Sequence, residues 1–289
     1  MSNPFLLRQS FLGRDSDTIL NASRVGIVGL GGGGSHIAQQ LAHIGVGRFA
    51  LCDPQRIEDT NLNRLVGATR ADIEQQTTKV TIAGRVILNI NPAAEITPVP
   101  KPWQADPEVL RECDVIIGCL DSFRARDELE RLTRRFLIPY IDIGMDVHAL
   151  EKGYLITGQV AVSMPAGPCL WCMGLITEEL LSEEAGQYGA AGGRPQVIWP
   201  NGILASTAVG LFVQLNTPWG RTGVDALPIL LEYDGNVHTV VPSNKLKFLK
   251  RRRCPHHQGF GDPFFKIQSL EENNHGDQNN VHQQGGRLS

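Results

Sequence analysis

Glycines and polar residues that could hold a nucleotide are concentrated in the first half of the chain. The glycines at 29, 31 and 34 fit the pattern G-x-G-x-x-G, and they follow directly after an apolar run that includes Val25 and Ile27. Without Cβ atoms, such a loop lets backbone N–H groups and a helix N-terminus approach phosphate oxygens. Asp53, 19 residues beyond Gly34, is placed to accept hydrogen bonds from ribose hydroxyls. Taken alone, this pattern favours a dinucleotide-dependent dehydrogenase.

A second set of polar residues changes that interpretation. Asn61, Arg64, Lys79 and Asp121 each lie near the carboxyl end of an expected strand or in the loop that follows it, and ligands bind at this edge of an open α/β sheet. Hydride transfer needs none of the four, whereas a triphosphate needs cations and a carboxylate that can hold Mg²⁺. The set therefore favours ATP, although each residue alone could be a turn cap, a helix cap or a solvated charge.

Three of the six cysteines have the spacing of a metal site. Cys169 and Cys172 form a Cys-x2-Cys pair, and Cys254 with His257 forms a distant Cys-x2-His pair. Three thiolates and one imidazole complete a tetrahedral structural Zn²⁺ site, with His256 as the weaker candidate for the fourth ligand. The alternative is a pair of buried thiols and an exposed pair of histidines. The remaining cysteines lie in or beside expected buried strands, where a thiol behaves as a small hydrophobe: Cys52, Cys113 and Cys119.

Strands and helices that would position these residues alternate along the first half of the chain. Strands alternating with helices predict a largely parallel sheet with helices on both faces. The first strand, helix and strand occupy about residues 24–53. The later elements are expected as helices at 78–89 and 124–136 and strands at 96–99, 114–120 and 139–143.

The pattern changes after Gly153. Residues 154–163 predict a longer strand with no helix before the next turn, which indicates antiparallel strands added to the sheet. Residues 202–215 predict a buried apolar helix, and residues 229–233 and 237–241 predict a hairpin. The fold class is therefore α/β: a Rossmann-like mixed sheet, with a parallel half plus added antiparallel strands, flanked by helices.

A single domain of residues 1–257 is expected, with an N-terminal helix, a nucleotide-binding half at about 24–150 and a substrate and zinc half at about 151–257. The residues that follow, 258–289, are rich in Asn, Gln and Gly and are expected to form a disordered tail. The net charge of −3 argues against a dedicated nucleic-acid binder. With no apolar run that approaches a membrane span and no signal peptide, we expect a cytoplasmic protein without a membrane partner.

From about Leu7 to His257 the sequence resembles the ThiF/MoeB/HesA adenylyltransferases, the bacterial relatives of ubiquitin-activating enzymes. The resemblance implies an enzyme that uses ATP and Mg²⁺ to activate the C-terminal glycine carboxylate of a ubiquitin-like or sulfur-carrier protein. Pyrophosphate would be released and an acyl-adenylate formed. The motifs that carry the resemblance are Arg8-Gln9, Gly29-Leu30-Gly31-Gly32-Gly33-Gly34-Ser35, Asp53, Asn61-Leu62-Asn63-Arg64, Lys79, and Cys119-Leu120-Asp121-Ser122 followed by Arg126.

The same resemblance implies residue roles. Asp53 would bind ribose, Asp121 would hold Mg²⁺, and Arg8 resembles an arginine finger that reaches the site of a partner subunit, which implies a homodimer. The implied catalytic residues are Arg8, Arg64, Lys79 and Asp121. The implied nucleotide-binding residues are Gly29, Gly31, Gly32, Gly33, Gly34, Asp53, Asn61, Arg64, Lys79, Asp121 and Arg126. Gly33 stands where a larger residue is usual, which we expect to loosen the turn.

A thioester-forming enzyme of this kind needs a cysteine in the loop that crosses over the site, and residues 177–199 contain none. We therefore expect the acyl-adenylate to be handed to a partner, such as a conjugating enzyme or a sulfurtransferase. A hydroxyl such as that of Ser182 is the alternative acceptor, and Gly186–Gly193 could form a mobile lid. The basic run 245–253 is a solvated face or a docking site for an acidic partner.

Three other functions remain open at this point. They are an NAD-dependent oxidoreductase of Rossmann type, a nucleotide-binding scaffold without turnover, and an enzyme that adenylates a small peptide or another carboxylate.

Overall fold

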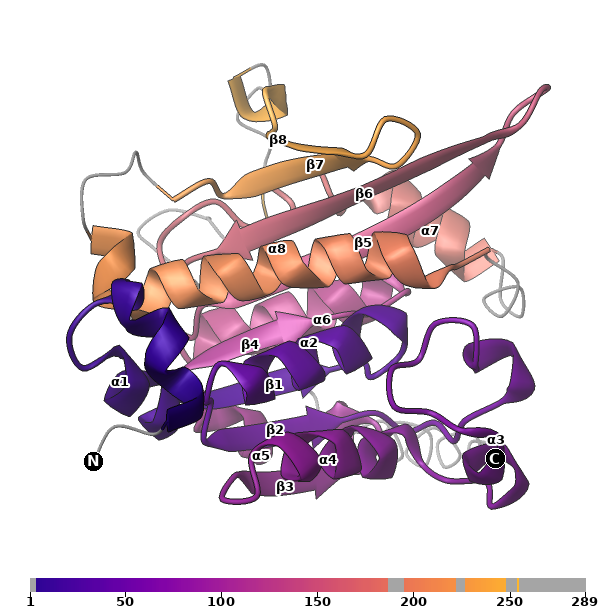
Figure 1. Cartoon of the computed structure of the whole chain (residues 1–289). Helices are drawn as coiled ribbons and strands as arrows, with labels where there is room; N and C mark the ends of the chain where they lie inside the picture. Colours follow the sequence, from indigo (N-terminus) through magenta and orange to yellow (C-terminus); the bar gives the residue numbers. More distant parts are fainter. Residues whose placement is uncertain (1–3, 187–194, 222–226, 248–253, 255–289) are drawn as a thin grey trace, which may run out of the picture.

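The computed structural model describes residues 4–186, 195–221, 227–247 and 254. Its centre is an eight-stranded sheet in the order β3-β2-β1-β4-β5-β6-β7-β8 (Figure 1). The first five strands in this order are parallel, and the last three continue the sheet antiparallel. The predicted mixed sheet is therefore confirmed. The strands are β1 Arg24–Val28, β2 Arg48–Cys52, β3 Glu95–Val99, β4 Val115–Gly118, β5 Tyr140–Ala149, β6 Tyr154–Ser163, β7 Leu230–Asp234 and β8 Thr239–Pro242.

Helices cover both faces of the sheet, with α2, α4 and α8 on one face and α5 and α6 on the other (Figure 1). Alternate side chains of a strand point to opposite faces, so neighbouring residues of β1 join different hydrophobic cores. Ile27 packs in the core under α2, α4 and α8, and Val28 packs in the core under α5 and α6. The helices are α1 Ser16–Ala22, α2 Gly32–His43, α3 Arg70–Glu74, α4 Lys79–Ile90, α5 Glu108–Arg111, α6 Phe123–Arg135, α7 Glu178–Gly186 and α8 Ile198–Asn216, with the 3₁₀ helices η1 Pro4–Leu12, η2 Asp59–Asn61, η3 Trp103–Ala105, η4 Pro218–Arg221 and η5 Lys245–Lys247.

The buried helix predicted at 202–215 is α8, which packs across α2, β5 and β6. Its 19 residues are also long and apolar enough to cross a membrane, so the expectation that no apolar run approaches that length was wrong. Half of this stretch is buried inside the fold. Since core helices of globular proteins meet the same criteria, α8 by itself is weak evidence for a membrane span.

β5 is longer than the strand predicted at 139–143, whereas β6 matches the strand predicted at 154–163. The two strands pair along their whole length, from Tyr140 opposite Ser163 to Ala149 opposite Tyr154, and they project beyond the neighbouring strands (Figure 1). The sequence indicated β5 only as far as Ile143, because the residues that follow lack the continuous apolar run of a buried strand. That outer half is only partly buried or exposed.

Candidate nucleotide-binding site

The glycine loop joins β1 to α2 at the carboxyl edge of the parallel strands. Gly29 has a φ of 88°, and a Cβ there would lie 2.6 Å from the carbonyl oxygen of Cys119, just after β4. A Cβ on Gly34 would lie 1.9 Å from the carbonyl oxygen of Gly29. Both positions therefore need glycine for the packing of the chain itself. Gly31 differs, because a Cβ there would have no neighbour within 4 Å; its backbone faces open space that a ligand can approach.

Gly32 and Gly33 belong to the first turn of α2 and are buried. A Cβ on Gly32 would lie 2.7 Å from Nδ2 of Asn201 on α8, and a Cβ on Gly33 would lie 2.5 Å from Cδ1 of Ile143 on β5. The expectation that Gly33 loosens the turn was wrong, since this residue lies inside the helix. Here glycine lets the first turn of α2 pack closely against α8 and β5.

Asp53 follows β2 and is held beside the glycine loop. Its Oδ2 accepts a hydrogen bond from the backbone N–H of Leu30 at 2.7 Å, and its Oδ1 accepts one from the backbone N–H of Gln55 at 2.8 Å. The side chain is buried. Because a carboxylate has about four lone-pair positions, it can still accept bonds from ribose hydroxyls.

Lys79 is the first residue of α4, and only 6% of its surface is exposed. Its Nζ donates a hydrogen bond to Oε1 of Gln55 at 2.5 Å. Within the described ranges, no carboxylate oxygen lies close enough to this ammonium group, at 4 Å or less, to form an ion pair. Asp53, Gln55 and Lys79 thus form a connected row next to the glycine loop. Sequence reasoning missed Gln55, because a neutral side chain two residues after an aspartate gives no signal of its own.

Asn61 and Arg64 lie in the loop between β2 and α3. The buried Asn61 is used locally, since its Oδ1 accepts a hydrogen bond from the backbone N–H of Glu58 at 3.2 Å. Nη1 of Arg64 donates to the carbonyl oxygen of Thr60 at 2.5 Å and to Oδ1 of Asn63 at 2.9 Å. In the part of the chain that the structure covers, no ion-pair partner of Arg64 occurs.

This loop is tied to the glycine loop at one point. The hydroxyl oxygen of Ser35, in the first turn of α2, accepts a hydrogen bond from the backbone N–H of Val66 at 3.0 Å. A second contact, from Nδ2 of Asn63 to the carbonyl oxygen of Gln196 at 3.0 Å, connects the loop to the segment before α8. The structure therefore brings the segment carrying Asn61 and Arg64 next to the glycine loop.

Asp121 lies in the loop between β4 and α6. Its side chain is exposed, and among the described residues it has no hydrogen-bond or ion-pair partner. Since Cys119 touches Gly29 and Asp121 comes two residues later, the two loops are neighbours at this edge of the sheet.

A carboxylate from the predicted crossover segment sits on the helix that follows Asp121. The side chain of Glu184 accepts hydrogen bonds from the backbone N–H groups of Phe123 and Arg124, both at 2.9 Å, and from the hydroxyl of Ser122 at 3.2 Å. Glu184 belongs to α7, a helix that the sequence did not predict. Its acidic side chain satisfies free N–H groups at the positive end of the α6 dipole.

Arg126 is buried between α6 and β5. Its Nε donates to Oδ1 of Asp142 at 3.0 Å, and its Nη2 pairs with Oδ2 of the same carboxylate. The hydroxyl of Tyr140 donates to Oδ1 as well, at 2.8 Å, and burial together with Asp142 raises the pKa of Tyr140 well above its ordinary value. The structure thus places Arg126 in a buried ion pair, and a contact from it to a nucleotide stays a prediction.

Arg8 lies at the other end of α2 from the glycine loop. It is exposed on η1, which is held by a hydrogen bond from Nε2 of Gln9 to the carbonyl oxygen of Ile44 at 3.1 Å. Ile44 ends α2, a helix of 12 residues, so Arg8 is separated from the first turn of α2 by about 18 Å along the helix axis. The structure does not bring Arg8 to the glycine loop of its own chain.

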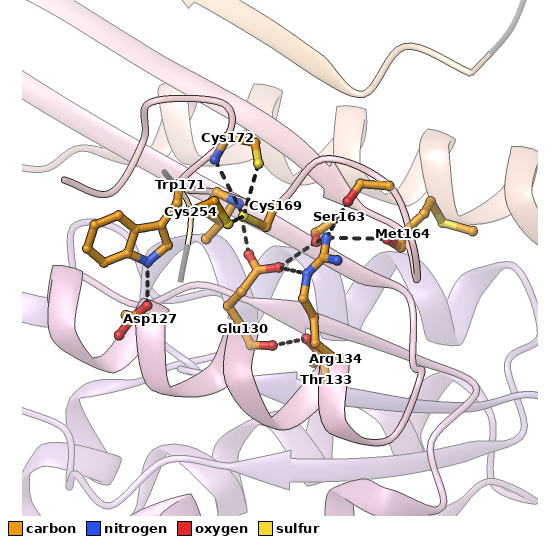
Figure 2. Close-up of polar contacts among 12 residues, drawn as sticks. Asp127, Glu130, Thr133, Arg134, Ser163, Met164, Cys169, Trp171, Cys172 and Cys254 are labelled. Carbon is orange, nitrogen blue, oxygen red and sulfur yellow. Dashed lines mark hydrogen bonds and ion pairs between the residues drawn. The ribbon is translucent and has the colours of Figure 1, made fainter. Parts of the chain in front are cut away.

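Three cysteines converge next to α6, on the face of the sheet opposite to α2 and α8 (Figure 2). The sulfur atoms of Cys169, Cys172 and Cys254 all lie within 4.8 Å of one another, with 3.5 Å between the first two and 3.0 Å between Cys169 and Cys254. Thiolates at about 2.3 Å from a tetrahedral Zn²⁺ would lie about 3.8 Å apart, so the cluster fits a metal site. His256 and His257 lie outside the described residues.

The loop with the first two cysteines is fastened to α6 (Figure 2). Oε2 of Glu130 accepts a hydrogen bond from the backbone N–H of Leu170 at 3.0 Å, and its Oε1 accepts bonds from Nε of Arg134 and the hydroxyl of Ser163. Nε1 of Trp171 donates to Oδ1 of Asp127 at 2.6 Å. Because both oxygens of the buried Glu130 carboxylate accept hydrogen bonds, this polar cluster can lie inside the fold.

The remaining cysteines agree with their interpretation as small hydrophobes, and of these Cys119 is partly buried and packs against the core. Cys52 and Cys113 are buried, and burial raises the pKa of Cys52 to about 12 and that of Cys113 to about 11. Both thiols therefore stay protonated near neutral pH. Of the basic run, only Lys245 to Lys247 is described, and there the ammonium group of Lys245 pairs with Oε1 of Glu232 at 2.5 Å.

An open α/β sheet with a glycine loop after its first strand, an aspartate after its second and cations at the same edge is the architecture of the Rossmann-like fold class. The chain belongs to the ThiF family, whose family model matches residues 6–245. It is 30% identical over 164 residues to the SAMP-activating enzyme E1 of Haloferax volcanii, covering 56% of this chain and 57% of that protein. It is also 36% identical over 118 residues to the molybdopterin-synthase adenylyltransferase of Escherichia coli K12, an alignment that covers 40% of this chain and 46% of that protein.

The chain therefore spans about half the length of the curated relatives that it matches. Among solved structures, it is similar to E. coli MccB crystallised with ATP, with a TM-score of 0.67 and 19% identity. That alignment covers 84% of this chain and 72% of MccB. The likeness supports the mixed-sheet fold across most of the protein.

Proposed function

We propose that this protein is an ATP-dependent adenylyltransferase that activates the C-terminal glycine carboxylate of a ubiquitin-like or sulfur-carrier protein. One observation carries the proposal. Lys79 lies beside the glycine loop, and Arg64 lies in the loop that Val66 ties to Ser35. Neither has a carboxylate partner in the described part of the chain, so both positive charges are available for an anionic ligand. Membership of the ThiF family and relatives named as adenylyltransferases support the same activity.

The reaction needs positioning and charge stabilisation more than proton transfer. The substrate carboxylate, already ionised at neutral pH, attacks the α-phosphorus of ATP. A new P–O bond forms as the bond to the β-phosphate oxygen breaks, and pyrophosphate leaves. Asn61, Arg64 and Lys79 would contact the phosphates, and the two cations would stabilise the negative charge that develops on the phosphate oxygens. Asp121 would hold Mg²⁺, which neutralises part of the triphosphate charge.

Other parts of the proposal concern the fate of the product. Since residues 177–199 contain no cysteine, the acyl-adenylate would pass to a sulfurtransferase or conjugating enzyme, in the cytoplasm where ATP and soluble carriers occur. Among the family members compared, none is named as an oxidoreductase, so the NAD-dependent alternative has no support. Adenylation of a small peptide remains an outcome that the experiment below can detect.

A second copy of the chain would complete the site. Around the exposed Arg8, η1 leaves three large apolar side chains in solvent, with exposed fractions of 47% for Phe5, 59% for Leu7 and 69% for Phe11. Such a patch is typical of a surface covered by another protein. In a homodimer, Arg8 would serve the site of the partner subunit, and its distance from its own glycine loop supports this arrangement.

We also propose that the cysteine cluster holds one structural Zn²⁺. Cys169, Cys172 and Cys254 would supply three thiolates, and His257 the imidazole. The ion would fasten the C-terminal region to the loop after β6. Its contribution is to folding, because a closed set of four protein ligands leaves no position for substrate.

Pyrophosphate exchange tests the reaction. Exchange of labelled pyrophosphate into ATP should appear with one or more carrier proteins ending in Gly-Gly and fall at least about a hundredfold in Asp121→Ala and Lys79→Ala, since each removes charge stabilisation of the transition state. Arg111→Ala is the control, because this exposed arginine lies ahead of β4. Lack of exchange with every carrier and peptide, or full exchange in both variants, would contradict the proposal.

Mixing of two inactive variants tests the role of Arg8. Neither Arg8→Ala nor Lys79→Ala should support exchange alone. A mixed dimer, however, contains one site with an intact Lys79 and an Arg8 from the partner, so activity should return after the two proteins are mixed. No recovery, with co-purification of differently tagged variants showing that mixed dimers form, would exclude action across the interface.

A further inference from the structure

Glu130 and Arg134 form a buried ion pair on α6, beside the cysteine loop of residues 164–172 (Figure 2). Their side chains are 0% and 2% exposed, and Nε of Arg134 donates to Oε1 of Glu130 at 2.8 Å. Apolar side chains in place of such a pair often give an equally stable protein, because burial removes both charges from water. Stability of the fold therefore gives little reason for this pair, and its other contacts show where it acts.

The pair holds the cysteine loop at several points. Nη2 of Arg134 donates to the hydroxyl of Ser163 and to the carbonyl oxygen of Gly167, both at 2.8 Å. Oε2 of Glu130 accepts the backbone N–H of Leu170, the residue after the first cysteine, at 3.0 Å. The two side chains thus fasten the loop from the end of β6 to the first metal ligand.

The conformation of the loop is one that its own residues do not favour. Ala166 has a φ of 61°, which is uncommon for a residue other than glycine. The loop also brings the sulfur atoms of Cys169 and Cys172 to 3.5 Å, and the backbone N–H of Cys172 donates to Sγ of Cys169 at 3.4 Å. Thiolates at this distance repel one another when no metal is bound. A loop without its contacts to α6 would therefore open, and metal binding would have to order it again.

We propose that Glu130 and Arg134 are positioning residues of the metal site, which hold the cysteine loop in its metal-binding conformation before the metal arrives. The inference rests on the zinc site proposed above and adds to it two residues that are not ligands. Such preorganisation raises affinity, because less conformational freedom is lost on binding. Since the pair carries no net charge, it adds no net negative charge beside the thiolates.

Glu130→Gln tests this role with almost no change in size. The glutamine has one acceptor oxygen, so it cannot satisfy both the Leu170 N–H and the donors that face the other carboxylate oxygen. The dissociation constant for Zn²⁺, measured by competition with a chromogenic chelator, should rise about tenfold to a hundredfold. Co²⁺ bound in place of zinc should give the same d–d absorption bands in both proteins, because the ligands themselves are unchanged.

Glu128→Gln is the matched control. This residue also lies on α6, but its carboxylate contacts Arg124 and Gln104 and not the cysteine loop. The substitution should leave zinc affinity within about twofold of the unsubstituted value, since it changes no contact of the loop.

Hydrogen exchange in the zinc-free protein separates positioning from general support of the fold. In Glu130→Gln, peptides covering residues 164–172 should exchange faster than in the unsubstituted protein, whereas peptides from β1 and α8 should not. Zinc should restore protection to the loop. If Glu130 only supported the fold, exchange would accelerate across the sheet as well.

A double variant covers the case in which Glu130→Gln does not fold, since that substitution leaves a buried guanidinium without its anion. Glu130→Leu/Arg134→Met removes both charges together with a modest change in volume. Its melting temperature without zinc should stay within about 5 °C of the zinc-free unsubstituted protein. Its zinc affinity and its loop protection should fall as in the single variant.

Two results would overturn the inference: an unchanged zinc dissociation constant in the folded Gln and Leu/Met variants, or equal exchange of residues 164–172 with and without the Glu130 carboxylate. Failure of the proposed zinc site looks different, because the unsubstituted protein would then take up no zinc. In that case exchange of the loop still shows whether the pair on α6 holds it.

Discussion

At the scale of single residues, the glycines of the first loop divide into two kinds. Gly29 and Gly34 are required by the fold, because a Cβ at either position would overlap the backbone of the chain. Gly31 has open space around it, so no overlap with the rest of the protein requires glycine there. A motif that looks uniform in sequence thus combines residues needed for packing with one that is free to face a ligand.

Two alanine substitutions test this division. Gly31→Ala should lower the free energy of unfolding by only about 1 kcal/mol, since no atom lies near the new methyl group and only the ψ of −145° is unusual for alanine. Its Mg-ATP affinity should fall about tenfold, because the new methyl group occupies the approach to the phosphates.

Gly29→Ala should instead affect mainly the stability of the protein. Its positive φ and the Cys119 carbonyl oxygen at 2.6 Å predict a loss of more than about 2 kcal/mol in urea unfolding. Equal stability in the two variants would contradict the division.

At the scale of secondary-structure elements, α6 connects several parts of the site. Its first turn follows Asp121 and binds Glu184 of α7, Arg126 fastens it to β5, and Glu130 and Asp127 hold the cysteine loop. Few of these contacts are local in sequence. Glu184, for example, lies about 60 residues from the N–H groups that it binds.

Removal of the Glu184 carboxylate should release α7. In Glu184→Ala, the first turn of α6 loses its partner, which we expect to cost about 1–2 kcal/mol in the local contact. Hydrogen exchange in residues 178–186 should accelerate, whereas global unfolding changes little. Glu183→Ala, an exposed neighbour on the same helix, is the control. Unchanged exchange in α7 after loss of Glu184 would show that other contacts hold this helix.

The contact between α3 and α4 should respond to pH. Asp72 caps α3 and pairs with Arg85 of α4 at 2.7 Å, and this guanidinium, first among several contacts, holds the pKa of Asp72 well below its usual range. A lowered pKa means that Asp72 stabilises the fold above about pH 4 and that this contribution is lost as pH falls through the folded-state value.

Asp72→Asn should therefore lower the free energy of unfolding by about 2 kcal/mol at pH 7, and the difference from the unsubstituted protein should shrink below about pH 4. Urea unfolding between pH 3 and pH 7 measures both effects. A difference that is independent of pH would mean that the ion pair is not the cause. Because the pair joins α3, which follows the loop of Asn61 and Arg64, to the helix of Lys79, nucleotide affinity should weaken with it.

At the scale of the whole molecule, the cysteine cluster joins regions that are distant along the chain. Cys254 meets Cys169 across 85 residues, and closing such a long loop stabilises a fold by restricting its unfolded chain. A metal there would connect the end of the described chain to the loop held by α6.

Metal analysis tests this connection. The purified protein should contain one zinc per chain, and removal of zinc by a chelator should lower the melting temperature by about 5–10 °C. Cys254→Ser and His257→Ala should reduce zinc content, whereas Cys113→Ala, which also removes a buried thiol, should leave it unchanged. Full zinc content in Cys254→Ser would exclude this thiol as a ligand.

The sequence by itself indicated the order of most strands and helices, the glycine loop and the residue types of a nucleotide site, because periodicity and turn chemistry act over a few residues. It missed α3, α5, α7 and the outer half of β5, which are short or whose residues carry weak local patterns. It also could not show that Arg126 pairs with Asp142, that Glu184 caps α6, or that Gln55 holds Lys79. These contacts were decided only by the tertiary structure, since burial and electrostatic partners depend on which distant segments the sheet brings together.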